Sequence, residues 1–165
     1  MPKVQPMLSA LIYTSRLVDK TTEIELQDLV LLAALNNKYS NITGILFLKG
    51  RKVIQYIEGD ANEISQLWSK IKLDSRHNIL KCRRFENRSQ RIFYKWHLGL
   101  INAKGRETLF NGIERLLDPK SSKITDRSFT DLLESKLLVL NNVLRFPDKS
   151  DPTTEMTFFD DLRID

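Results

Sequence analysis

Residues 44–59 of the chain read GILFLKGRKVIQYIEG, and this stretch predicts a β-hairpin. The runs GILFLK and KVIQYIEG are rich in β-branched and aromatic residues, which favour strands. Gly50 stands between them and can adopt the backbone angles of a tight turn. An isolated hairpin is barely stable in water, so the flanking segments must supply the rest of a sheet and its cover.

The segments before the hairpin predict one strand and one helix. The string MLSALIYTS, residues 7–15, is apolar on both alternating faces and rich in strand formers, which indicates a buried strand. Residues 23–39 then place apolar side chains at three- and four-residue steps, and Thr21 or Thr22 can cap them. We expect a helix there.

The segments after the hairpin predict a second helix and two more strands. The helix runs from about Asp60 to Leu73 with Asp60 as its cap, and the strands HNILKCRRFE and KWHLGLI follow, joined by the polar turn NRSQR. The order strand, helix, strand, strand, helix, strand is that of the ferredoxin-like fold. We therefore expect an α+β domain over residues 1–101, a ferredoxin-like βαββαβ unit with an added fifth strand and both helices on one face of a mixed sheet.

A C-terminal helical extension is expected over residues 102–145. One helix is predicted over 106–117, where Asp118-Pro119 stops it, and a second from about 125 to 145. The second helix has an apolar stripe made of Phe129, Leu132, Leu133, Leu137, Leu140 and Leu144. This stripe can cover the open face of the sheet or form a subunit interface.

The last segment, residues 146–165, contains two prolines and many charges. This composition is typical of a mobile tail. Phe158, Phe159 and Leu162 nevertheless offer apolar side chains that could dock on the domain.

Composition and charge exclude several classes of protein. The 165 residues include no run of 18 apolar ones, and the single cysteine, Cys82, cannot form an internal disulfide, so we expect a cytoplasmic protein without a membrane span. Two histidines and one cysteine give no zinc-binding spacing. Residues 1–101 carry 16 basic against 9 acidic side chains, which fits a phosphate-bearing ligand or simply a solvated surface. No nucleophile motif or glycine-rich phosphate loop is present, so we do not expect an enzyme.

Polar side chains stand at strand positions where apolar ones would be cheaper to bury. Alternation places Gln55 on the same face as Val53 and Ile57, and Tyr13 on a core-facing position of the first strand. A buried amide without a partner costs about 1–3 kcal/mol, so Gln55 needs a tyrosine hydroxyl or a polar ligand. Taken singly, such residues more often pack, face solvent or, as Asn41 could, end a helix.

Taken together, the segments LIYTS, NITGIL, VIQYIEG, DSRHNI and FYKWHLGL, in this order, resemble the BLUF family of blue-light sensors using FAD over about residues 8–101. The resemblance implies FAD as the cofactor, held between the two helices. It implies that Tyr13 is the photoactive tyrosine, that Gln55 is the glutamine that switches, and that Asn41 hydrogen-bonds the edge of the flavin.

The same resemblance assigns further residues. Arg76 and His77 would line the pyrimidine side of the flavin, Ser40 would stand beside the binding asparagine, and Trp96 would report on the switch. Leu98 occupies a position where the family usually has methionine. The implied function is a light sensor that rearranges hydrogen bonds around the flavin and signals to a separate protein, and we also expect it to form a homo-oligomer.

A ferredoxin-like RNA-binding module is the alternative interpretation. Such a module stacks bases on two or three exposed aromatic side chains of its central strands. The hairpin offers Tyr56 alone at a candidate exposed position, so we do not expect a nucleic-acid partner.

Overall fold

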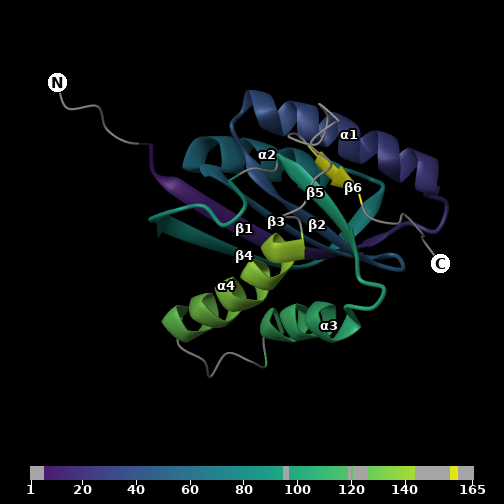
Figure 1. The fold of residues 1–165 in the computed structure, drawn as a ribbon. Coiled ribbons are helices and arrows are strands. Elements are labelled where there is room, and N and C mark those ends of the chain that lie inside the picture. Colours follow the sequence, from purple (N-terminus) through teal and green to yellow (C-terminus); the bar gives the residue numbers. More distant parts are fainter. Residues whose placement is uncertain (1–5, 95–96, 119, 121–125, 144–156, 160–165) are drawn as a thin grey trace.

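In the computed structural model, residues 6–94, 97–118, 120, 126–143 and 157–159 are described. They form one mixed sheet with helices on both faces (Figure 1). The strands are β1 (Leu8–Leu17), β2 (Thr43–Lys49), β3 (Lys52–Asp60), β4 (His77–Arg88), β5 (Leu98–Asn102) and β6 (Thr157–Phe159). The helices are α1 (Glu23–Tyr39), α2 (Ala61–Leu73), α3 (Glu107–Leu116) and α4 (Asp126–Val143).

The strand order β4-β1-β3-β2-β5-β6 contains the ferredoxin-like core that the sequence predicts. The first four strands pair antiparallel as β4-β1-β3-β2, and β5 is added beside β2 in parallel orientation. Helices α1 and α2 lie on one face of the sheet (Figure 1). The predicted α+β class, the added fifth strand and the C-terminal helical extension are therefore confirmed.

Local chemistry explains where the elements begin and end. Thr22 and Glu25 form a capping box at the start of α1, in which the Thr22 hydroxyl accepts from the Glu25 N–H at 3.2 Å. Asp60 caps α2 by accepting from the Asn62 N–H at 2.9 Å. Gly44 lets β2 approach β3, because a Cβ there would lie 2.0 Å from the Tyr56 carbonyl oxygen.

The C-terminal helices cover the face of the sheet opposite α1 and α2 (Figure 1). Phe129, Leu133, Leu137 and Leu140 of α4 join Phe110 of α3 in one buried cluster with the sheet residues Ile12, Phe47, Ile54 and Tyr56. The apolar stripe of α4 therefore covers the open face of the sheet, which is one of the two roles that the sequence left open. Leu132 belongs to the predicted stripe but is 44% exposed, and Leu144 lies outside the described residues.

Two expectations about the C-terminal part need correction. Strand β5 begins at Leu98 rather than at Lys95, and residues 95–96 lie outside the described residues. Within the predicted tail, residues 157–159 form β6, which pairs parallel with β5. A short segment can pair with a strand through its backbone N–H and C=O groups, which do not depend on the side chains around it. The rest of 146–165 lies outside the described residues.

None of the helices within the described ranges is long and apolar enough to cross a membrane.

Candidate functional site

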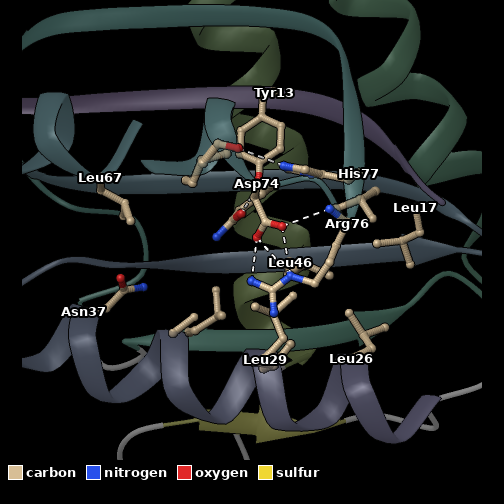
Figure 2. A pocket seen from close by; sticks show the side chains of 16 residues that line it. Tyr13, Leu17, Leu26, Leu29, Asn37, Leu46, Leu67, Asp74, Arg76 and His77 are labelled. Carbon is tan, nitrogen blue, oxygen red and sulfur yellow. Dashed lines mark hydrogen bonds and ion pairs between the residues drawn. The ribbon is translucent and has the colours of Figure 1, made fainter. Parts of the chain in front are cut away.

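A cavity lies between the sheet and the two helices α1 and α2 (Figure 2). Its helix walls are apolar except for Asn37 of α1, and their apolar members are Leu26, Leu29, Val30 and Ala33 from α1 and Leu67 and Ile71 from α2. The sheet and the start of β4 add the polar side chains of Tyr13, Gln55, Asp74, Arg76 and His77. Four of the residues singled out from the sequence, Tyr13, Gln55, Arg76 and His77, therefore meet in one place.

Tyr13 and Gln55 form a hydrogen-bonded pair in the floor of the cavity. They are direct neighbours in the β1–β3 register, and the Tyr13 hydroxyl donates to Gln55 Oε1. Both side chains are buried, with 2% and 7% exposed. Among the described residues Gln55 Nε2 has no acceptor, and the side chain lines the cavity. The amide thus presents a donor to whatever the cavity holds.

The phenol of Tyr13 is held in its neutral form. Burial raises its pKa far above the ordinary value, and the negative charge of Asp74 adds to the effect. The ring also contacts Trp68, with centroids 5.3 Å apart, and meets the His77 ring edge-on at 5.9 Å. Tyr13 is therefore a fixed proton donor toward Gln55.

His77 is oriented by both of its ring nitrogens. Nε2 lies 3.0 Å from the Ile71 carbonyl oxygen, which can only accept, so Nε2 carries a proton. Nδ1 lies 2.9 Å from the Ser15 hydroxyl and, in a neutral ring, accepts from it. These two bonds tie β1, the end of α2 and the start of β4 around the cavity.

Arg76 and Asp74 form an ion pair that reaches into the cavity (Figure 2). Arg76 Nη2 lies 2.6 Å from Asp74 Oδ2, and the Arg76 N–H donates to Oδ1 at 2.9 Å. These hydrogen bonds hold the pKa of Asp74 below its ordinary value. Arg76 also lines an outer pocket together with Lys20, Glu25 and Asp28, so it stands between the inner cavity and the molecular surface.

Asn37 lines the cavity, whereas Asn41 and Ser40, which were expected beside the flavin, are not among its lining residues. Asn37 is 2% exposed and its Nδ2 donates to the His97 carbonyl oxygen at 2.8 Å. Ser40 is the C-cap residue of α1. Asn41 lies one residue further, with φ of 50° and an exposed side chain.

Helix α1 ends at Tyr39, so Ser40 and Asn41 lie beyond the helix residues that line the cavity. Helical spacing places Asn37 on the inner face of α1, where Leu26, Val30 and Ala34 are the other buried positions. A polar residue on this otherwise apolar face is the signal that was missed.

The start of β5 completes the cavity wall. Leu98 lines it and is 1% exposed, and the His97 carbonyl and ring bond to Asn37 and to the Ile42 carbonyl. Trp96, expected to report on the switch, lies outside the described residues. Apolar helix walls with amide and phenol groups along one side suit a flat heteroaromatic ligand with a polar edge.

Comparisons with known proteins point to one family. A family model described as BLUF, sensors of blue-light using FAD, matches residues 8–99. The blue light- and temperature-regulated antirepressor BluF of Escherichia coli strain K12 is 30% identical over 95 residues, which are 53% of this chain and 24% of BluF. The chain thus matches about a quarter of the length of that relative.

Solved structures of BLUF proteins share the fold of this chain. The dark-state structure of BlrB, a BLUF protein, superposes with a TM-score of 0.63 at 23% identity, covering 82% of this chain and 98% of BlrB. A structure titled BlrP1 BLUF gives a TM-score of 0.59 at 28% identity, covering 81% of this chain and 91% of that one. The matched region is that of a flavin-binding sensor domain. With more than half of its residues matched to the family model, the chain belongs to the BLUF family of blue-light sensors.

Proposed function

We propose that the protein senses blue light with FAD bound in the cavity between α1 and α2, and that it signals through a hydrogen-bond change at Gln55. The Tyr13–Gln55 pair is the observation that carries the proposal, because it places a buried proton donor against a switchable amide at the cavity floor. Tyr13 satisfies the amide oxygen of Gln55, and a bound ligand would supply the acceptor that Nε2 lacks within the described part of the chain.

The residues of the cavity fit a flavin. Leu29, Val30 and Leu67 would pack on the faces of the ring, while Asn37, Gln55 and His77 would meet its polar edge. Lys20 and Arg76 in the outer pocket support a cofactor with phosphates, although Glu25 and Asp28 share that pocket. FAD is proposed rather than another flavin because the family description names it.

The switch would work through the two ends of the Gln55 amide. The flavin would supply the absorption of blue light and the transient electron acceptor. Tyr13 holds a proton at Oη and donates it to Gln55 Oε1 in the present arrangement. Rotation of the amide would turn Nε2 toward the Tyr13 oxygen and present the amide oxygen to the cavity, whereas tautomerisation would move a proton from Nε2 to Oε1 and reverse donor and acceptor without moving either atom. Every hydrogen bond made by this side chain would then be remade.

The absorption spectrum of the purified protein tests the proposal. We expect a yellow protein whose flavin band moves to the red by roughly 10 nm under blue light and returns in the dark, because a new hydrogen bond perturbs a polarisable ring. Acid-released cofactor run against FAD and FMN standards identifies the flavin. A colourless protein that cannot be reconstituted with either flavin would contradict the proposal.

We also propose that a separate protein receives the signal and that the sensor acts in the cytoplasm as a homo-oligomer. The name of the relative BluF, an antirepressor, supports a protein partner. Five apolar side chains on the outer side of α1, Ile24, Leu31, Leu32, Leu35 and Tyr39, are exposed and support an oligomer. Sedimentation velocity of the wild type and Leu32→Glu checks this point, with a monomeric wild type as the contradicting result.

A further inference from the structure

Glu58 is a buried carboxylate that the light switch does not use. It lies on β3 three residues after Gln55, so its side chain faces the opposite side of the sheet from the cavity. The side chain is 1% exposed and lies beside the aromatic cluster of Tyr56 and Phe93. An ionisable group is rarely left in such surroundings without a specific contact to make.

The contact is with the backbone of the β4–β5 connection. Glu58 Oε2 accepts from the Ile92 N–H at 3.0 Å, and Oε1 accepts from the Phe93 N–H at 2.6 Å. The Tyr56 hydroxyl donates to Oε2 at 3.1 Å. Two consecutive backbone donors outside any strand or helix are thus held by one side chain, and both Ile92 and Phe93 are buried.

Arg91 fastens the same segment to neighbouring backbone. Its Nη1 donates to the Glu58 carbonyl oxygen at 3.0 Å and to the Thr43 hydroxyl at 2.9 Å, and its Nη2 donates to the Asn41 carbonyl oxygen at 2.7 Å. Residues 91–93 are therefore attached both to β3 and to the connection between α1 and β2.

The segment that Glu58 holds precedes two residues of the cavity wall region, His97 and Leu98, in the chain. His97 is bound to Asn37 and to the Ile42 carbonyl, and Leu98 lines the cavity. One strand, β3, thus carries the proposed switch on one face and, on the other, the carboxylate that anchors the connection to β5. A fixed point in this connection would give the start of β5 a support against which it can move when Gln55 changes.

We propose that Glu58 is the positioning residue that fixes residues 91–93 and thereby makes the start of β5 respond to the switch. The inference rests on the proposed function and adds to it a residue that touches neither the flavin nor the Tyr13–Gln55 pair. Its chemistry requires a carboxylate, because each of its two oxygens accepts from one backbone N–H.

Amide hydrogen exchange in dark and light, together with the absorption spectrum, tests this role with Glu58→Gln in the flavin-loaded protein. The variant keeps the shape of the side chain but has one acceptor oxygen, and its NH₂ group faces a backbone donor. We expect at least one of the Ile92 and Phe93 amides to exchange at least tenfold faster in the dark. We expect the red shift to remain, and the light-minus-dark exchange difference over residues 97–102 to fall to less than half of the wild-type value.

Two further variants make the test specific. Tyr56→Phe removes one donor to Glu58 but leaves both backbone bonds, so it should keep wild-type exchange at both amides. Glu58→Asp keeps the charge, but its side chain is one methylene too short to reach both amides, so it should give the same result as Glu58→Gln. If Glu58→Gln does not fold, Glu58→Asp takes its place in the experiment.

The failures are distinguishable. A wild-type protein without any red shift would overturn the proposed function. A wild-type red shift with unchanged exchange at residues 92–93 in the Glu58 variants, or with an undiminished light-minus-dark difference over 97–102, would overturn the role of Glu58 alone. A wild type that shifts its spectrum but shows no exchange difference over 97–102 would also overturn it.

Discussion

At the residue scale, several polar side chains that line the cavity are bonded to partners within the protein. Tyr13 donates to Gln55, Asn37 donates to the His97 carbonyl, and His77 lies between Ser15 and Ile71. These bonds fix the orientation of the groups before any ligand binds. Such preorganisation reduces the entropy that binding has to overcome.

Asn37→Ala is expected to weaken flavin binding about five- to tenfold, since a lost buried hydrogen bond costs on the order of 1–1.5 kcal/mol. The measurement is fluorescence quenching of FAD titrated with apoprotein. Asn41→Gly is the matched control, because glycine tolerates the φ of 50° at that position and no contact with the cavity is removed. Equal affinities for the two variants would refute the assignment of Asn37.

At the element scale, the sequence predicted most of the architecture because the signals are local. The cap and spacing of α1 gave its bounds, and the hairpin of β2 and β3 followed from two strand-forming runs around one glycine. Strand β6 could not be predicted, since three residues pair with β5 through backbone bonds that composition does not encode. The order of the segments pointed to Asn41, whereas the periodicity of α1 places Asn37 on the face that lines the cavity.

Buried polar contacts between distant segments were also beyond prediction. Alternation places Glu58 opposite Gln55, but nothing in the sequence indicates that its oxygens bind the backbone of residues 92 and 93. Such contacts depend on the path of a connection, which the sequence leaves open. For Gln55 the sequence indicated the need for a tyrosine hydroxyl or a ligand, and the β1–β3 register identifies Tyr13 as that tyrosine.

Leu137→Ala tests whether α4 is part of the folded domain. Leu137 is fully buried against the sheet, so its truncation should lower the free energy of unfolding by about 2–5 kcal/mol. Leu132→Ala, on the same helix but 44% exposed, should change it by less than about 1 kcal/mol. Urea unfolding followed by circular dichroism provides both values. Similar small effects for both variants would mean that α4 does not cover the sheet in solution.

At the scale of the whole molecule, the sheet separates two faces with different tasks. The face toward α1 and α2 carries the cavity, and the face toward α3 and α4 is a closed apolar core (Figure 1). Glu58 is buried on the face toward α3 and α4, where it holds the β4–β5 connection. Burial of its charge lowers the free energy of unfolding.

Stability should therefore depend on pH through Glu58. Burial raises the pKa of its carboxyl above the ordinary value of 4.5, and the backbone N–H bonds and Arg91 offset this only in part. The folded protein then binds a proton that the unfolded chain has lost, so this group's contribution to the free energy of unfolding falls as pH rises above 4.5 through the raised value. In urea unfolding from pH 4 to 8, the free energy of unfolding of the wild type should fall relative to that of Glu58→Gln as pH rises. A relative increase with rising pH would contradict the raised pKa of Glu58.

The light-minus-dark absorption difference of Gln55→Leu beside the wild type tests the central claim most directly. At equal flavin occupancy, the wild type should give the difference spectrum of a band moved to the red, and Gln55→Leu should give none, because leucine fills the same space without an amide to reverse. Tyr13→Phe, recorded in the same experiment, should also be silent, since it removes the hydroxyl that donates to Gln55. A normal reversible red shift in Gln55→Leu with flavin bound would contradict the account.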